Sequence, residues 1–261
     1  MASAGVAVLA QISDVHLRVR GDGGVSARAL EDAVRSVAAL DPAPRALLIS
    51  GDLADTGSAD EYRCARDLLA PLTVPIHVVA GNHDDRDGLS EHFGAPVAGG
   101  LVQYAAGVGP LRLVVCDTML PGRNEGRYGP ERIAWLREAL AADRETPTIV
   151  AMHHPPLTTG IGVVDELGML PADQAALGEL IGRGPQVKRI VAGHAHRAFA
   201  GALAGCVVSV CPSTTFQLDL GASLSGRVVL VREPPGFALH IAHGGEVTSH
   251  TLPIGDHPPV D

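Results

Sequence analysis

The sequence of 261 residues is poor in cysteine and in aromatic side chains. It has 4 cysteines and 1 tryptophan, and Phe, Trp and Tyr together make up 3% of the chain. No two cysteines are spaced as a CxxC pair, so a structural zinc knuckle is not indicated and the thiols are expected to be buried and reduced. These cysteines are Cys64, Cys116, Cys206 and Cys211.

Positive charge is scarce as well, because 20 Lys and Arg residues face 29 Asp and Glu residues and give a formal net charge of −9. Proteins that bind nucleic-acid polymers usually carry a basic stripe, and those that bind single strands add aromatic side chains on which bases stack. Neither feature is visible, so no nucleic-acid polymer is expected as a partner. An acidic chain fits a small soluble substrate or bound cations.

Targeting signals are missing too. The apolar segment 1–12 has no basic residues at its start and is too short to span a bilayer. We interpret it as the first strand, and we expect a cytoplasmic protein without a membrane span.

Apolar residues make up 46% of the chain, which is enough for a sizeable core. Up to residue 192, short apolar runs alternate with segments of helical periodicity, which predicts α/β layering. Beyond Gly201, strand-like segments follow one another without helices and predict an antiparallel meander in a second sheet. The predicted strands are 6–12, 46–50, 75–80, 111–116, 148–152, 187–192, 206–210, 227–232, 237–243 and 246–252, and the predicted helices are 26–40, 58–69, 130–142 and 172–181.

These segments predict a single domain over residues 1–254. Its antiparallel second-sheet region lies at about 201–254, and a loose C-terminal tail follows at 255–261.

Five polar blocks stand where predicted strands end. In an open α/β sheet, ligands bind outside the carboxyl ends of the strands, so residues far apart in sequence can converge on one crevice. Alone, an Asp or Asn after a strand is a turn residue, and a lone His is a core residue. The recurrence of the pattern favours a shared site. The blocks are Asp14-Val15-His16, Gly51-Asp52-Leu53-Ala54-Asp55, Gly81-Asn82-His83-Asp84, Val150-Ala151-Met152-His153 and Gly193-His194-Ala195-His196.

The side chains of these blocks offer imidazole, carboxylate and amide groups. This mixed set suits Mn, Fe, Zn, Co or Ni better than Ca or Mg, which prefer oxygen alone. Seven ligands are too many for one ion but suit two ions that share a bridge, and Asp52 can bind one ion with each carboxylate oxygen. Two ions roughly 3.5–4 Å apart can clamp the attacking and leaving oxygens of an in-line displacement. The candidate metal ligands are Asp14, His16, Asp52, Asn82, His153, His194 and His196.

In combination, the motifs DxH, GDxxD, GNHD, VxxH and GHxH resemble the calcineurin-like metallophosphoesterase superfamily, over about residues 12–219. The closer similarity is to bacterial class III cyclic nucleotide phosphodiesterases and glycerophosphodiesterases. The resemblance implies a four-layer αββα sandwich, two mixed β-sheets flanked by helices, with the metal site at the carboxyl ends of the strands. It also implies two divalent or trivalent transition-metal ions (Fe, Mn, Zn or Co). One ion would take Asp14, His16, Asp52 and His196, and the other Asp52, Asn82, His153 and His194.

Further roles follow for neighbours of the ligands. His83 is the candidate general acid, and together with Asn82 it is expected to contact the substrate. The bridging Asp52 is also assigned to catalysis. Asp55 either orients a ligand histidine or a metal-bound water from behind, or caps the helix predicted from residue 58. His154 is assigned a structural role. Loops 119–129 and 157–170 either wall the pocket or join two copies, which leaves a homodimer or a higher homo-oligomer open.

We therefore expect a hydrolase of small phosphodiesters, such as 3′,5′- or 2′,3′-cAMP or glycerophosphodiesters, that acts by attack of a metal-bound hydroxide. The alternatives are a phosphomonoesterase of the same superfamily and a scaffold without metals, although all seven ligand positions are filled. Similar protein phosphatases clamp doubly charged monoesters with arginines after the GDxxD and GNH blocks. Here Thr56 and Gly57 follow the first block, and Arg86 lies between Asp85 and Asp87, which favours a diester.

Overall fold

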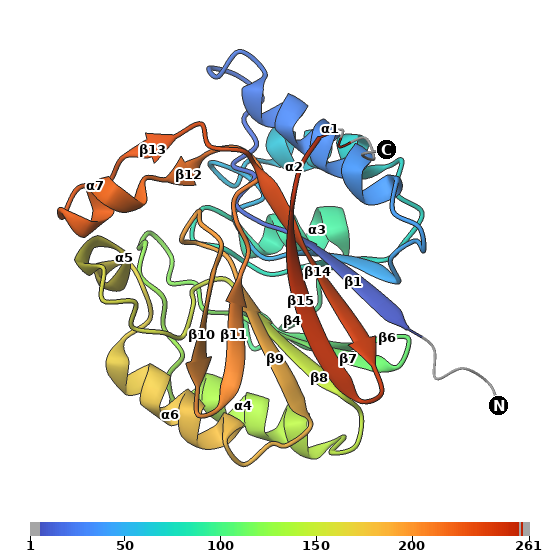
Figure 1. Ribbon diagram of the computed structural model, residues 1–261, viewed down its shortest axis with the longest axis vertical. Helices are drawn as coiled ribbons and strands as arrows, with labels where there is room; N and C mark the ends of the chain where they lie inside the picture. The colour runs from blue at the N-terminus through green and yellow to red at the C-terminus, as the bar shows by residue number, and fades with distance from the viewer. Residues whose placement is uncertain (1–5, 256, 258–261) are drawn as a thin grey trace.

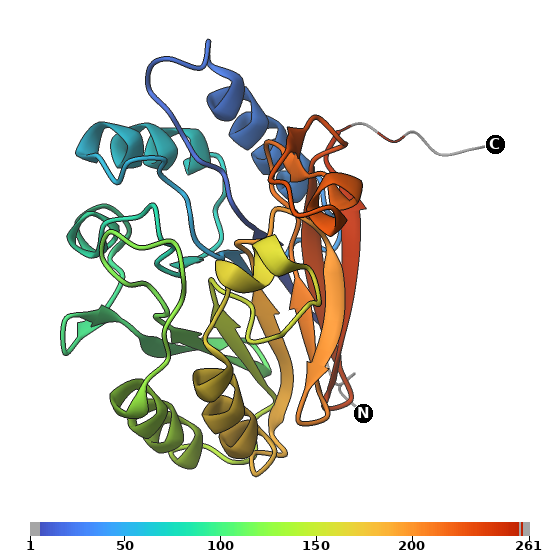
Figure 2. The same cartoon turned by 90° about the vertical axis from the view of Figure 1, so that its left-hand side faces the viewer.

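The computed structural model describes residues 6–255 and 257, and its two large sheets lie face to face between two layers of helices (Figures 1 and 2). Helices α1 (Val25–Ala38), α2 (Ala59–Leu69) and α3 (Arg86–Phe93) cover the first sheet, and α4 (Pro130–Ala141) and α6 (Pro171–Ile181) cover the second. The predicted four-layer αββα sandwich of two mixed sheets is confirmed.

The first sheet has five strands in the order β15-β14-β1-β2-β3. Strands β1, β2 and β3 run parallel, while β14 is antiparallel to β1 and β15 is antiparallel to β14. The strands are β1 (Ala7–Ile12), β2 (Ala46–Ile49), β3 (Ile76–Val78), β14 (Gly236–His243) and β15 (Glu246–Pro253).

The second sheet has six strands in the order β10-β11-β9-β8-β7-β6. Its four central strands are parallel, and the edge strands β6 and β10 are antiparallel to their neighbours. The strands are β6 (Tyr104–Val108), β7 (Leu111–Cys116), β8 (Thr148–Met152), β9 (Val187–Ala192), β10 (Phe199–Leu203) and β11 (Cys206–Val210).

Side chains of the central strands alternate between two hydrophobic layers, as the pleat of a strand requires. In β1, Val8 and Ala10 pack against α1–α3, whereas Ala7 and Leu9 face the second sheet. Because both faces of each sheet are covered, these strands read as continuous apolar runs rather than as alternating ones.

The expectation that residues 201–254 form one meander in the second sheet is wrong. Strands β10 and β11 do join the second sheet, but β14 and β15 extend the first sheet beside β1. The predicted strand 227–232 shrinks to β13 (Leu230–Val231), which pairs with β12 (Gln217–Leu218) in a separate ribbon. The apolar pattern of β14 identifies a strand covered on both faces, but it does not identify the edge with which that strand pairs.

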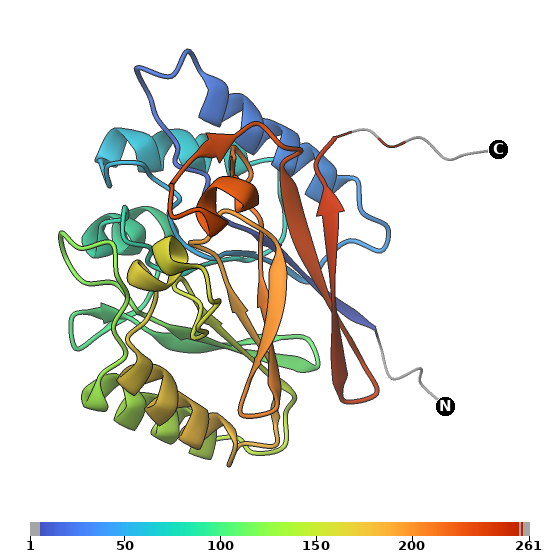
Figure 3. The same ribbon diagram turned by 60° about the vertical axis from the view of Figure 1, so that its left-hand side comes forward.

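Eight elements have no counterpart among the predicted segments. Besides α3, β6, β10 and β12, they are β4 (Val97–Ala98), β5 (Leu101–Val102), α5 (Gly162–Glu166) and α7 (Leu220–Leu224). Most of them are too short to show a periodicity in the sequence. Figure 3 shows α5 and α7 next to each other at one end of the sandwich.

Three smaller expectations can be compared with the fold. All four cysteines are free, but only Cys116 and Cys211 are buried, while Cys64 and Cys206 are partly exposed. None of the described helices is both long and apolar enough to cross a membrane. Of the predicted tail only residues 255 and 257 are described, and residues 1–5 of the predicted domain also lie outside the described part.

One polar side chain stands in the apolar layer between the sheets. Nε2 of Gln11 donates to Oγ of Ser50 at 2.7 Å and to the carbonyl oxygen of Ala192, on the second sheet, at 3.0 Å. Its Oε1 accepts from Nε2 of His240 at 2.8 Å. Burial lowers the pKa of His240 to about 3, so this ring is neutral. Gln11 therefore links β1, β14 and the end of β9.

Gln11→Met keeps the length of the side chain but leaves the Nε2–H of His240 buried without its acceptor. We expect the free energy of unfolding to fall by about 1–3 kcal/mol, the usual cost of an unsatisfied buried group. Urea denaturation followed by circular dichroism measures the loss. Gln11→Met/His240→Met removes both partners, so its loss should be smaller than the sum of the two single losses. Strictly additive losses would contradict the network.

Candidate metal centre

The seven predicted ligands converge at one edge of the sandwich, where strands of both sheets end. Each sheet supplies part of the set, so the cluster exists only where the two sheets meet. Strands β1, β2 and β3 lead into Asp14, His16, Asp52 and Asn82, whereas β8 and β9 lead into His153, His194 and His196.

Backbone strain is concentrated at these residues. A left-handed φ, which L side chains rarely adopt, costs of order 1–3 kcal/mol and persists only where the surroundings over-determine it. Among the described non-glycine residues, Ala204 is the one position outside the cluster with such a φ. At these positions the surrounding structure holds the backbone in a conformation that the residues would not prefer on their own. The strained ligands are Asp14 (52°), His16 (46°), Asp52 (51°), His194 (67°) and His196 (48°).

Close packing explains two glycines of the motifs. A Cβ on Gly51 would lie 2.2 Å from Nδ1 of His153, and a Cβ on Gly81 would lie 2.2 Å from Oδ1 of Asp52. Neither neighbour can move away without displacing a ligand side chain. The glycines before Asp52 and Asn82 are thus part of the cluster's geometry.

The first half of the cluster holds Asp14, His16 and His196, whose ligand atoms lie within 4.8 Å of one another. Nε2 of His16 is 3.0 Å from Nε2 of His196 and 3.5 Å from Oδ2 of Asp52. Nε2 of His196 is 3.7 Å from Oδ1 of Asp14. Asp52 therefore lies next to this half, on the side facing the rest of the cluster.

The second half holds Asn82, His153 and His194 on the other side of Asp52. Nε2 of His153 is 3.3 Å from Oδ2 of Asp52 and 3.0 Å from Oδ1 of Asn82. Nδ1 of His194 is 3.1 Å from the same Asn82 oxygen. Oδ2 of Asp52 thus lies within 3.5 Å of a ring nitrogen from each half, while its Oδ1 accepts from the backbone N–H of His83. Asp52 stands between the halves as predicted, but the same oxygen faces both of them, rather than one oxygen facing each.

Hydrogen bonds fix the tautomers of three of these histidines. Each ring donates one N–H to a backbone carbonyl, which leaves the lone pair of its other nitrogen directed at the cluster, the arrangement typical of metal-binding histidines. The donors are Nδ1 of His153 to Ser50 (2.8 Å), Nε2 of His194 to Leu167 (2.9 Å) and Nδ1 of His196 to Phe216 (3.1 Å).

The donor set fits bound cations. Lone pairs of nitrogen and oxygen face one another at about 3 Å, and such contacts are favourable only with positive charge between them. Burial disfavours a charge on His153, but the Asp52 carboxylate outweighs it and raises the pKa of His153 to about 9. Burial likewise opposes ionisation of Asp52, yet the neighbouring histidines hold its pKa well below its usual range. Imidazole, amide and carboxylate ligands together suit transition metals.

Asp55 lies behind His16. Its Oδ1 is 3.3 Å from Nδ1 of His16, and Nε of Arg18 binds its Oδ2 at 2.8 Å. The bonds from His16 and Arg18 lower the pKa of Asp55 to about 2. Helix α2 is capped by other residues, because it begins after Ser58, whose N–H donates to Glu61 at 3.1 Å. Of the two alternatives for Asp55, its contacts fit the orientation of a histidine.

His83 stands between Asp52 and the open side of the cluster. Its backbone N–H donates to Oδ1 of Asp52 at 2.9 Å, and its Nδ1 donates to the carbonyl oxygen of Asp55 at 2.8 Å. The ring meets His16 edge-on, with 4.6 Å between the centroids. Because Nδ1 is engaged, Nε2 is the nitrogen available to a ligand in the cavity that His83 lines.

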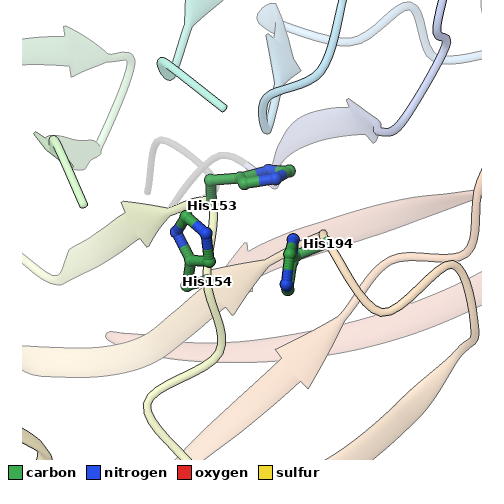
Figure 4. Close-up of side chains that lie close together, drawn as sticks. All are labelled: His153, His154 and His194. Atoms are coloured by element: carbon green, nitrogen blue, oxygen red, sulfur yellow. The ribbon is translucent and has the colours of Figure 1, made fainter. Parts of the chain in front are cut away.

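His154 is buried beside the cluster, next to His153 and His194 (Figure 4). Its Nδ1 accepts from Oγ1 of Thr118 at 2.8 Å, and its Nε2 donates to the carbonyl oxygen of Asn124 at 3.0 Å. Both nitrogens are therefore occupied, and burial holds the pKa well below its usual range. These contacts anchor loop 119–129 to the end of β8.

Asp84 is a buried residue of the site to which the sequence analysis gives no role. Its carboxylate accepts backbone N–H groups of Gly81 at 3.0 Å, Ala54 at 3.1 Å and Leu53 at 3.4 Å, and the hydroxyl of Tyr62 at 3.2 Å. Asp84 thus joins the loop that carries Asp52 to the turn that carries Asn82. Its place in a Gly-Asn turn is the available signal, because Asp side chains often bind nearby backbone N–H groups.

A cavity of about 280 Å³ opens over the cluster. The loops 119–129 and 157–170 both contribute to its wall, as one of the two alternatives for them proposes. Sequence reasoning did not assign Arg18, Phe216 or the β12–β13 ribbon to the site, since their approach depends on how distant loops fold. The lining residues outside the cluster are Arg18, Asp55, His83, Asn124, Val163, Val164, Leu167, Ala195, Phe216, Leu218, Val228 and Leu230.

Arg86 contributes no charge to this cavity. Its Nε and Nη2 bind the buried carboxylate of Asp117 at 2.7 and 2.9 Å, and Nη2 also binds the carbonyl oxygen of Met119 at 2.8 Å. Among the described residues that line the cavity, Arg18 is the one Arg or Lys, and Asp55 neutralises it.

Comparison with known proteins identifies the family. The family model described as calcineurin-like phosphoesterase matches residues 7–198. The chain therefore belongs to the calcineurin-like phosphoesterase family, and the resemblance seen in the motifs is confirmed.

Several curated proteins are similar over most of their length. A probable cyclic nucleotide phosphodiesterase of Synechococcus sp. is 33% identical over 87% of this chain and 88% of its own. A cAMP/cGMP dual specificity phosphodiesterase of Mycobacterium tuberculosis is 34% identical over 84% and 71%. A probable glycerophosphodiester phosphodiesterase of Arcobacter nitrofigilis is 27% identical over 95% and 93%. Among solved structures, a dimetal phosphatase from Danio rerio shares the fold with a TM-score of 0.69 at 15% identity, over 95% of this chain and 99% of that one.

Removal of the bridge should empty both halves of the centre. We expect the purified protein to hold about two transition-metal ions per chain, as in two-metal sites generally, and Asp52→Ala to lose most of both. Elemental analysis after dialysis measures the metal content. Asp60→Ala, which changes an exposed carboxylate on α2, is the control and should keep both ions. Full metal content in Asp52→Ala would rule out this bridge.

Proposed function

We propose that the chain hydrolyses small phosphodiesters with two bound Fe, Mn, Zn or Co ions. The observation that carries the proposal is the position of Asp52, whose Oδ2 lies within 3.5 Å of a ring nitrogen in each half of the cluster. The curated relatives named as cyclic nucleotide and glycerophosphodiester phosphodiesterases support a diester as the substrate.

The positions of the candidate ligands support the predicted division between two ions. Two ions held there would supply positive charge for the phosphoryl oxygens and lower the pKa of a bound water toward neutral pH. Asp14, His16, Asp52 and His196 would hold one ion, and Asp52, Asn82, His153 and His194 the other.

The chain's own residues position the substrate and move the proton. The side-chain amide nitrogen of Asn82 lies on the cavity side, 3.5 Å from Oδ1 of Asn124, where it can donate to a phosphoryl oxygen. In its protonated form His83 is held through Nδ1 by the carbonyl oxygen of Asp55 and presents Nε2–H to the cavity. We assign to His83 the transfer of this proton to the leaving oxygen.

The size of the cavity supports a small partner. A volume of about 280 Å³ suits a small ester and not a polymer. We propose a small diester as the partner, without a nucleic-acid polymer, and a cytoplasmic location for the enzyme. Neither a phosphomonoesterase nor a metal-free scaffold is favoured by a specific observation.

Substrate charge separates the diesterase from the phosphatase alternative. A monoester carries about two negative charges and a diester one, and the only Arg among the described residues lining the cavity is already paired with Asp55. We expect a higher kcat/KM for bis(p-nitrophenyl) phosphate than for p-nitrophenyl phosphate, which share a leaving group, and measurable hydrolysis of a cyclic nucleotide. Assays in the Mn, Fe/Zn and Co forms provide the comparison. A monoester preference of about tenfold or more in all forms would favour the phosphatase.

The role of His83 depends on the leaving group. An alkoxide leaves poorly without a proton, whereas nitrophenolate leaves readily, so His83→Ala should lose far more rate on alkyl or ribose diesters. The loss of a positioned acid is about 10²–10⁴-fold. Steady-state kinetics with both substrate types measures the difference, and His243→Ala, an exposed histidine at the end of β14, is the control. Equal losses on both leaving groups would make His83 a phosphate-binding residue instead.

A further inference from the structure

The cavity over the metal centre has an aliphatic wall on two sides. Residues of α5 and of the turn that follows it form one part of this wall, and residues of the β12–β13 ribbon and of the segment just before β13 form the other. We call these residues the aliphatic wall: Val163, Val164, Leu167, Leu218, Val228 and Leu230.

Polar partners for a substrate are few in this part of the cavity. Among the described lining residues outside the metal cluster and His83, the polar side chains are those of Arg18, Asp55 and Asn124. Arg18 and Asp55 bind each other, and Oδ1 of Asn124 faces the amide of Asn82. Where a hydroxyl group is pressed against these aliphatic side chains, it finds no hydrogen-bond partner among them to replace the water that it displaces, which is unfavourable.

Much of the wall is exposed to solvent. The exposed fractions are 60% for Val228, 52% for Leu230 and 37% for Leu167. Aliphatic side chains do not stabilise an anionic phosphate, but they gain free energy when an apolar group covers them. Exposed apolar surface that continues into a binding cavity indicates a ligand with an apolar part.

The wall is attached to the ligand loops, which places it beside the reacting phosphate. The carbonyl oxygen of Leu167 accepts from Nε2 of His194 at 2.9 Å. The N–H of Leu218 donates to the carbonyl oxygen of His196 at 3.0 Å, and its own carbonyl oxygen accepts from Nε of Arg197 at 2.7 Å. One residue from each part of the wall, Leu167 and Leu218, is therefore hydrogen-bonded to a candidate metal ligand.

We propose that the aliphatic wall is a subsite for the ester arm that stays on phosphorus, and that it selects alkyl or aryl arms over polyol arms such as glycerol. This inference rests on the proposed phosphodiesterase activity. The bond broken is the one between phosphorus and the leaving oxygen, water supplies the new oxygen, and the arm remains as an alkyl or aryl phosphate. The wall therefore acts on substrate choice and not on the chemistry.

A homologous series of substrates tests the subsite. In methyl, ethyl, propyl and butyl p-nitrophenyl phosphate the leaving group is constant and only the arm grows. We expect kcat/KM to rise about two- to fourfold per added methylene, the gain from burying one CH₂ group at least in part. The propyl diester should also exceed the 2,3-dihydroxypropyl diester, which has the same carbon chain with two hydroxyls, after subtraction of enzyme-free release.

Paired variants locate the effect on the wall. Leu230→Ser should flatten the rise across the series, whereas Leu224→Ser, on α7 and outside the cavity lining, should keep the wild-type rise. Val228→Ser and Val207→Ser form a second pair, because Val207 is exposed on β11 and also lies outside the lining. All four substitutions are at exposed positions, so loss of folding is not expected.

The outcomes distinguish the subsite from the activity itself. A flat series, a preference for the 2,3-dihydroxypropyl arm, or an equal effect of Leu230→Ser and Leu224→Ser would overturn the subsite and leave the phosphodiesterase in place. If no diester of the series is hydrolysed with any of the metals, while a monoester is, the proposed function fails first.

Discussion

The candidate metal centre depends on one constraint, that two sheets end at the same edge and face each other across Asp52. Neither sheet carries a complete half of the cluster, because Asp14, His16 and Asn82 come from the first sheet and the other histidines from the second. A shift of one sheet against the other would separate ligands that now lie about 3 Å apart. Apolar packing between the sheets resists such a shift, but it does not fix one relative position of the sheets, because it is not directional. The hydrogen bonds of Gln11 help to fix that position, because they connect both sheets directly beneath the candidate ligands.

The same constraint explains why unfavourable features gather at this edge. The ligand loops hold left-handed φ angles at Asp14 and Asp52, buried carboxylates at Asp52 and Asp84, and glycines without room for a side chain at positions 51, 81 and 193. Each is destabilising by itself, and each is tolerated because the loops hold one another. Asp84 is an example, since a single buried carboxylate binds N–H groups from two ligand loops. Strain at a site of this kind is expected where function fixes the position of side chains.

The sequence predicts the centre better than the connections around it. The convergence of the candidate ligands could be predicted because each lies shortly after the end of a strand, and strands β7, β8, β9 and β11 were bounded correctly by their apolar runs. The partner of β14 could not be inferred, because pairing depends on long-range packing and not on local pattern. The short helices α5 and α7 have too few residues to show a period. Arg18 and Phe216 reach the site only through the way distant loops fold, so no motif marks them.

Electrostatics and wall chemistry together set what the site can recognise. The two arginines near the motifs are already neutralised, Arg86 by Asp117 and Arg18 by Asp55, so in the proposed reaction positive charge for a phosphate would come from bound ions. Because this charge would lie at the ligand cluster, the ester group of the substrate would contact the aliphatic wall. A second negative charge would gain little there, because no free cation of the described lining faces it. An uncharged arm meets no such penalty. The pairing of the arginine in the described lining and the exposed valine and leucine side chains beside it both support the proposal of a singly charged phosphate with an apolar arm.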